Sequence, residues 1–285
     1  MNHRTVQRLF SCLLPALVAG LSAFLPVQAQ NDYAPHYRRQ AYKGVVRLVG
    51  GGGLGYYGGE MRSHLLTTMS LRPNINIGIS YRLTQHVSLR GELGAYRLAG
   101  SDVAGLNEHR NLSFRTDNPE FYLVGVYNLF PYTQLSAYNF YVLGGLGFTR
   151  VNPKGRMNNR YYSLPRMRTE GVAYPRYAAM IPIGFGVSRR IKYGFDLALE
   201  ARFTYTTTDY LDDVSTVYPQ ADLNNLAAAF SDRSVEAGFP PNPSGSKRGN
   251  SSSNDGYLFL QIRFEHTLGS SRRAIRRAQL RCANP

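Results

Sequence analysis

The chain has 285 residues, with 33 Lys and Arg against 18 Asp and Glu, and it contains 28 Gly, 21 Tyr and no Trp. This length suits one domain or two small ones. The mean hydropathy of −0.30 excludes a bundle of membrane-spanning helices, because each span needs about 20 nearly uninterrupted apolar residues. Charged residues make up 18% of the chain, below the roughly 25% of typical soluble domains. The abundance of Tyr and Gly therefore favours an all-β chain.

The first residues predict export. Arg4 and Arg8 precede an apolar run over residues 9–27, and small residues follow at a cleavage site. This order of basic, apolar and small residues is typical of a secretory signal peptide. We expect residues 1–29 to be a cleaved signal peptide and residues 30–43 to be a periplasmic segment. An uncleaved membrane anchor is the alternative.

Export also constrains the cysteines and the partners. Cys12 lies in the signal peptide, so the mature chain keeps only Cys282 and can form no internal disulfide. The formal net charge is +15, and a basic chain can bind nucleic acid. An exported protein meets phosphate on lipopolysaccharide and lipid headgroups instead. We therefore expect outer-membrane lipid and lipopolysaccharide as partners, and no nucleic acid.

Apolar and polar residues alternate with a period of two along much of the chain. The clearest segment runs from Asn74 to Leu83, and the pattern resumes from Val87 to Tyr96 after a short connection. These two segments predict a β-hairpin. The same alternation, clear or weak, predicts six further strands at Val45–Tyr57, Glu120–Leu129, Asn139–Arg150, Tyr177–Arg190, Phe195–Thr206 and Tyr257–Phe264.

The connections between the eight predicted strands are alternately long and short. Outer-membrane barrels have an even number of strands, short periplasmic turns and long extracellular loops. The sequence therefore predicts an all-β fold, an eight-stranded antiparallel transmembrane up-and-down β-barrel over residues 44–268. Residues 269–285, with five arginines, then form a basic periplasmic tail. The longest connection contains Pro240, Pro241 and Pro243 and is expected to be mobile.

A soluble barrel or sandwich also alternates, with its apolar face inward. The polar face here carries Gly, Ser, Asn and opposite charges rather than a coat of Lys and Glu, which suits a narrow, filled lumen. We expect a lumenal charge network that contains Arg90, Glu92, Glu200 and Arg202. The sequence does not show which of these residues pair across strands. Interfacial girdles are expected from aromatic residues near strand ends, namely Tyr56, Tyr57, Tyr81, Tyr127, Phe130, Tyr132, Tyr205, Tyr210 and Phe264.

Three stretches, Arg72–Leu98, Arg110–Phe121 and Thr208–Tyr218, resemble an uncharacterised family of Gram-negative outer-membrane β-barrel proteins. More broadly, the chain resembles the small OmpA/OmpX-like barrels over about Lys43–Leu268. The resemblance implies an eight-stranded barrel in the outer membrane and no established activity. The last strand, Gly256–Phe264, resembles the aromatic-ended signal that the barrel-assembly machinery reads, which implies that machinery as a partner.

Three carboxylates, Asp209, Asp212 and Asp213, follow the seventh predicted strand. Ca²⁺ prefers such oxygen ligands, but the spacing does not match an EF-hand loop. We expect these side chains to bond loop amides or nearby arginines, and we expect no metal and no cofactor.

Some eight-stranded barrels modify lipid A, so serine and histidine side chains near the outer end are candidate catalytic groups. His64, beside Ser63, falls in the first outer loop, and His109 falls in the second. His86 and His266 lie near the periplasmic ends. No recognisable signature surrounds any of them. We therefore expect a structural or adhesion-like envelope component without catalysis; a lipid-A-modifying enzyme or a small-solute pore is the alternative.

Arginine outnumbers lysine, 29 to 4. Guanidinium groups bind phosphate oxygens better than ammonium groups do. Seven arginines fall in or beside the predicted outer loops and are candidates for lipopolysaccharide phosphates, with solvated loop charge as the alternative: Arg97, Arg110, Arg115, Arg156, Arg160, Arg166 and Arg168.

Overall fold

The computed structural model describes most of the predicted barrel region. The described residues are 44–61, 71–104, 107–132, 138–192, 194–220 and 223–268. The predicted signal peptide, periplasmic segment and basic tail lie outside them, as do Ser63 and His64. No helix in the described ranges is long and apolar enough to cross a membrane.

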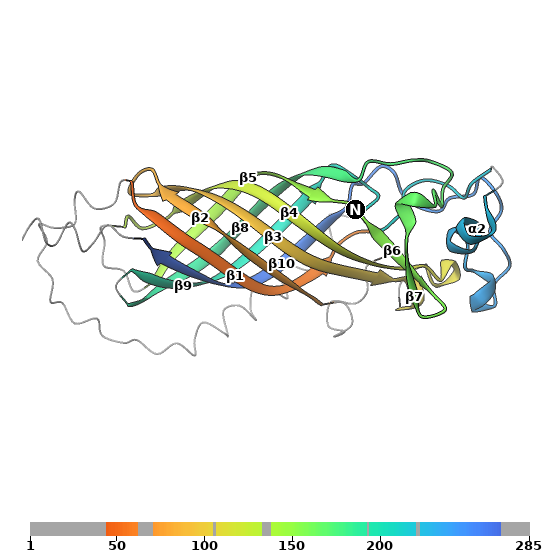
Figure 1. The fold of residues 1–285 in the computed structure, drawn as a ribbon, viewed down its shortest axis with the longest axis horizontal. Coiled ribbons are helices and arrows are strands. Elements are labelled where there is room, and N and C mark those ends of the chain that lie inside the picture. Colours follow the sequence, from red (N-terminus) through yellow and green to blue (C-terminus); the bar gives the residue numbers. More distant parts are fainter. Residues whose placement is uncertain are drawn as a thin grey trace, which may run out of the picture. The chain divides into compact units, whose positions relative to one another are not determined.

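Eight antiparallel strands close into a barrel (Figure 1). They are β1 (Val46–Tyr57), β2 (Arg72–Arg82), β3 (Val87–Ser101), β4 (Ser113–Asn128), β5 (Tyr138–Arg150), β8 (Tyr177–Lys192), β9 (Phe195–Thr206) and β10 (Gly256–Thr267). Each strand pairs with its neighbours in this order, and β1 pairs with β10. Closure bonds the backbone amides and carbonyls within the sheet, as lipid requires. The predicted eight-stranded up-and-down barrel is confirmed.

Two further strands extend one side of this barrel. The hairpin of β6 (Pro153–Met157) and β7 (Arg160–Ser163) lies in the connection between β5 and β8. Strand β6 pairs with β4 at Arg115, beyond the Glu120 position where β4 begins to pair with β5. The end of β3 and the beginning of β4, together with β6 and β7, therefore form a sheet beyond the barrel wall. We call it the projecting sheet.

The outward surface of the barrel is apolar. On β2, Ile75, Ile77 and Ile79 are 66%, 59% and 55% exposed, whereas Asn76 and Ser80 between and beyond them are buried. A sheet in a soluble protein buries its apolar face instead. The apolar rows thus face acyl chains and the polar rows face the lumen, which is the arrangement of a transmembrane barrel.

Exposed aromatic side chains flank this apolar surface. Tyr81 and Tyr127 lie near the short turns, and Tyr177 and Tyr205 lie near the long connections. Such belts mark the two membrane interfaces. The girdle prediction is wrong for Tyr57, which is 1% exposed, because odd-numbered residues of β1 face inward.

The outward surface gives a direct test of the membrane assignment. Leu93, in the middle of β3, is 62% exposed. We expect Leu93→Arg to destabilise the barrel in lipid vesicles by about 2–4 kcal/mol, because the charge must sit among acyl chains. Leu83→Arg, at the short turn after β2 where Leu83 is 39% exposed, is the matched control and should cost about 1 kcal/mol or less. Equal losses in urea unfolding would contradict the assignment.

The longest connection, between β9 and β10, contains regular structure in the ranges that the structure describes. It contains helix α2 (Asn225–Ser231) and an internal β-bridge between Val217 and Lys247. Phe230 of α2 packs on Tyr162 of β7, with ring centroids 5.5 Å apart. Helix α2 therefore packs on the β6–β7 hairpin, and both lie at the same end of the barrel (Figure 1).

Candidate functional site

Four charged side chains meet inside the barrel and form what we call the central quartet. Arg90 Nε lies 2.7 Å from Glu92, and Arg90 Nη2 donates to Glu200 at 2.8 Å. Arg263 donates to Glu92 at 2.8 Å and lies 3.5 Å from Glu200. All four side chains are at most 1% exposed. Two guanidinium groups thus neutralise two carboxylates, the condition under which buried charges are tolerated.

Three strands supply the central quartet. Arg90 and Glu92 lie on the inward face of β3, Glu200 on β9 and Arg263 on β10. Gly51 of β1 leaves room for them, because a Cβ atom there would lie 3.1 Å from Arg263 Cγ. Arg263 was not predicted as a member of this network, although alternation along β10 already places it inward.

Arg202 belongs to a second pair. Its Nη2 donates to Glu120 rather than to Glu200, its neighbour two residues away on β9. Tyr257 donates to the other oxygen of Glu120 at 3.0 Å. The guanidinium carbon of Arg202 lies 4.2 Å from the ring centroid of Tyr122, a cation–π geometry. The two predicted members on β9 therefore find separate partners across the lumen.

A third group lies nearer the short turns. Arg47 of β1 donates to Glu265 at 2.6 Å and also to Asp196. Its side chain is 5% exposed. Charged pairs thus occupy the lumen from the short-turn end to its middle.

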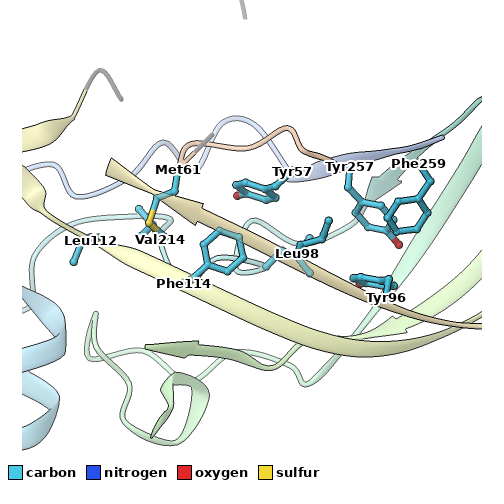
Figure 2. Packing of buried hydrophobic residues seen from close by; sticks show 10 residues of the cluster. Tyr57, Met61, Tyr96, Leu98, Leu112, Phe114, Val214, Tyr257 and Phe259 are labelled. Carbon is cyan, nitrogen blue, oxygen red and sulfur yellow. The ribbon is translucent and has the colours of Figure 1, made fainter. Parts of the chain in front are cut away.

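Toward the long connections, the lumen is filled by an apolar cluster (Figure 2). The rings of Tyr57 and Phe114 lie 4.8 Å apart, and those of Tyr96 and Tyr257 lie 4.9 Å apart. The loop between β9 and β10 contributes to the same core. The cluster contains Tyr57, Met61, Tyr96, Leu98, Leu112, Phe114, Leu211, Val214, Tyr257 and Phe259. Loop and barrel therefore share one hydrophobic core.

The three predicted aspartates lie at the base of the long connections and have different surroundings. Asp213 accepts hydrogen bonds of 2.5 Å from the hydroxyls of Thr169 and Tyr174. Asp212 is fully buried; one oxygen accepts from Val214 N at 2.9 Å, and Oδ2 has no hydrogen-bond partner. Burial and the nearby Asp255 raise the pKa of Asp212 well above its ordinary value.

Asp255, which was not among the predicted aspartates, joins Asp209 and Asp212 in what we call the carboxyl cluster. It accepts from Tyr57 Oη at 2.5 Å and from Leu211 N at 2.9 Å. Burial, followed by repulsion from neighbouring carboxylates, raises the pKa of Asp255 to about 7 and the pKa of Asp209 to about 8. Such groups hold protons near neutral pH.

Two buried arginines tie the long connections to one another. Arg110 donates to both oxygens of Asp102 at 2.9 and 3.0 Å and to Arg248 O at 2.5 Å. Arg248 donates to Glu170 at 2.8 Å and to the backbone oxygen of Asp213 at 2.5 Å. The prediction of Arg110 as a phosphate ligand is wrong, because its side chain is 4% exposed and its donors serve other loop residues.

The described residues contain no group of three His, Cys, Asp or Glu side chains arranged to hold a metal ion. The Ca²⁺ hypothesis for the three aspartates therefore has no support in the geometry. Asp213 instead bonds loop hydroxyls, and Asp212 bonds a loop amide.

The histidines are spread over both ends of the barrel. His109 is exposed between β3 and β4, and His266 is exposed at the end of β10. His86 Nδ1 lies 2.8 Å from Asn128 O near the short turns. Within the described ranges, no histidine side chain hydrogen-bonds a serine or threonine hydroxyl.

Comparison with solved structures finds small barrels. Neisserial surface protein A is 10% identical, with 78% of this chain and 97% of that chain covered and a TM-score of 0.43. A major outer membrane protein from Thermus thermophilus is 11% identical, with coverage of 78% and 99% and a TM-score of 0.39. OprG from Pseudomonas aeruginosa is 8% identical, with coverage of 80% and 98% and a TM-score of 0.35.

No protein-family model and no curated protein sequence matches the chain. The architecture follows from the chain's own strand pairing and polarity. Its eight strands close upon themselves, and its apolar rows face outward. The protein is a small eight-stranded barrel of the outer-membrane type.

Proposed function

We propose that the protein is a closed, non-enzymatic barrel of the Gram-negative outer membrane, exported by its signal peptide and inserted by the barrel-assembly machinery. It serves as a structural or adhesion-like envelope component. Its long connections face the outside, and its short turns face the periplasm, as in outer-membrane barrels generally. The filled lumen carries this proposal.

The lumen supports a closed barrel rather than a pore. Arg90, Arg202 and Arg263 are 1%, 0% and 0% exposed, and each has a carboxylate partner. A permeating ion must break these buried pairs, and loss of one partner from a buried pair costs about 3–5 kcal/mol. The apolar cluster then blocks the other half of the lumen. What remains for interaction is the surface formed by the long connections.

One part of that surface is basic. The connection between β5 and β8 exposes five arginines, while its one acidic residue, Glu170, is buried against Arg248. The exposed arginines are Arg156, Arg160, Arg166, Arg168 and Arg176. A surface of one charge sign attracts oppositely charged partners over distances set by ionic strength. Anionic envelope components are the partners that fit it.

Conductance distinguishes the closed barrel from a pore. We expect the purified, folded protein to give no discrete current steps in a planar bilayer. A trimeric porin in the same bilayer serves as the positive control, and heat-modifiable migration on gels shows that the inserted protein is folded. Reproducible single-channel steps from the wild-type barrel would contradict the closed lumen.

A further inference from the structure

The outward face of the projecting sheet carries a row of cations. Residues that are direct partners on adjacent strands point to the same face. Arg97 of β3 faces outward like Leu93, because the two are an even number of residues apart. The pairing then places the other members beside it. The row, which we call the cationic face, consists of Arg97, Arg115, Lys154 and Arg156, with Asp117 and Tyr161 among them.

One carboxylate holds three of these cations together. Asp117 lies 2.5 Å from Arg97, 3.3 Å from Arg115 and 3.6 Å from Lys154. The guanidinium carbon of Arg115 lies 5.1 Å from the ring centroid of Tyr161. Asp117 thus orients the cations without neutralising them, and an excess of positive charge remains. The side chains are 31–39% exposed, so they exchange partners with anions in solvent at little cost.

The position of the cationic face relative to lipid is defined by the strands themselves. Leu93, Phe121 and Phe148 are successive partners on β3, β4 and β5 and are 62%, 50% and 63% exposed. Arg97 is four residues beyond Leu93 on the same face, roughly 13 Å along the strand. Arg115 is six residues beyond Phe121, roughly 20 Å away. The cations therefore begin where acyl chains give way to headgroups and continue outward from there.

The cationic face occupies only one sector of the barrel. In the described parts of β1, β9 and β10, the outward positions at the same end hold Tyr56, Tyr205 and Leu258. These side chains are aromatic or aliphatic. A general attraction to an anionic membrane surface would not require the cations to lie in one sector. Nor would it require them to lie at two different distances from the acyl chains, as Arg97 and Arg115 do.

We propose that the cationic face is a docking site for lipopolysaccharide. Its acyl chains lie against Leu93, Phe121 and Phe148, and its lipid A and inner-core phosphates bind Arg97, Arg115 and Lys154. Guanidinium groups match phosphate oxygens in a bidentate geometry. A glycerophospholipid has a phosphate at one height only, whereas lipopolysaccharide carries phosphates at several heights, as the row of cations does. This inference rests on the outer-membrane location in the proposed function.

The test compares two sets of three charges in the full-length protein in phosphatidylethanolamine nanodiscs, probed with purified diphosphoryl lipid A carrying a phosphorylated inner core. The first variant combines Arg97→Gln, Arg115→Gln and Lys154→Gln. The matched control combines Arg272→Gln, Arg273→Gln and Arg276→Gln, which removes the same charge from the C-terminal tail rather than from the cationic face. By native mass spectrometry, we expect the first variant to bind at least about tenfold more weakly and the control to bind within about twofold of wild type.

Two further measurements do not depend on the folding of the triple variant. Asp117→Asn removes the only carboxylate of the face and is expected to bind lipid A at least as tightly as wild type. Dephosphorylated lipid A is expected to bind the wild-type protein more weakly than the phosphorylated probe does and, where the first triple variant folds, no more tightly than it binds that variant. Equal weakening by both triple variants, unchanged binding by the first, or wild-type affinity for the dephosphorylated probe would each overturn the docking site. Heat-modifiable migration and absent conductance test the closed barrel separately, so failure of one is distinguishable from failure of the other.

Discussion

Glu200→Gln is expected to destabilise the folded barrel by about 3–5 kcal/mol, because it leaves buried arginines without a carboxylate partner. Glu200 faces both Arg90 and Arg263 and accepts a 2.9 Å hydrogen bond from Tyr141. After the substitution, two guanidinium groups share the single carboxylate of Glu92, and all three side chains are at most 1% exposed. Burial this deep keeps bulk solvent from compensating the lost charge.

Unfolding by urea in lipid vesicles measures this effect. The chain has no Trp, so far-ultraviolet circular dichroism and the heat-modifiable gel shift are the suitable signals. Glu236→Gln is the matched control, since Glu236 pairs with Arg233 in a loop and its side chain is 47% exposed; it should cost about 1 kcal/mol or less.

The double variant Glu200→Gln with Arg90→Met separates the lost charge from lost packing. It removes one cation with one anion and leaves Arg263 paired with Glu92 at 2.8 Å. We expect it to recover part of the stability, because the remaining charges balance again. If Glu200→Gln and Glu236→Gln cost the same, the central quartet does not support the barrel.

The sequence predicts the barrel well where lipid imposes a pattern. Between Ile75 and Ile79, each outward residue must be apolar and each inward residue must suit the lumen, so period-two alternation identifies both the strand and its faces. The pattern fails where the strands leave the lipid. From Arg115 to Asn118, β4 is polar on both faces, so its first residues, Ser113–Pro119, were not predicted. The β6–β7 hairpin was missed for the same reason.

The sequence predicts which charged residues lie in the lumen, but it does not predict which of them pair. Alternation identifies Glu200 and Arg202 as inward residues of one strand, but arginine side chains reach across the lumen. Arg202 therefore binds Glu120 of β4, and Glu200 binds Arg90 of β3. Both partners depend on the curvature and register of the closed sheet. Asp255 was missed because the folded loop, rather than a sequence spacing, brings it to Asp209 and Asp212.

Raising the pH from 5 to 7 is expected to loosen the long connections at the carboxyl cluster. The pKa of Asp255 is about 7 and that of Asp209 about 8 in the folded loops, against roughly 4 for an exposed aspartate. The closed loops therefore bind more protons than the opened loops at intermediate pH. Their stability is complete below about pH 4 and falls as pH rises through the folded pKa values.

Hydrogen-exchange protection factors for amides of residues 207–217 measure this opening with the intrinsic pH effect removed. Each linked proton lowers the protection factor by about tenfold per pH unit within this window. The hydroxyls of Tyr57 and Ser215 and the charges of Glu60 and Arg110 also face the carboxyl cluster. The pKa values of Asp209, Asp212 and Asp255 are raised in their presence, so these groups do not reverse the sign of the effect.

Asp209→Asn removes one of the responsible groups. The amide has the size of the protonated carboxyl and no charge to develop, so the variant should lose less loop protection than wild type between pH 5 and 7; a smaller pH dependence remains because Asp255 still titrates. Glu236→Gln, in the same connection but exposed, should leave the wild-type profile unchanged. Protection that is constant or that increases between pH 5 and 7 would show that the buried carboxyls do not hold the loops closed through their protons.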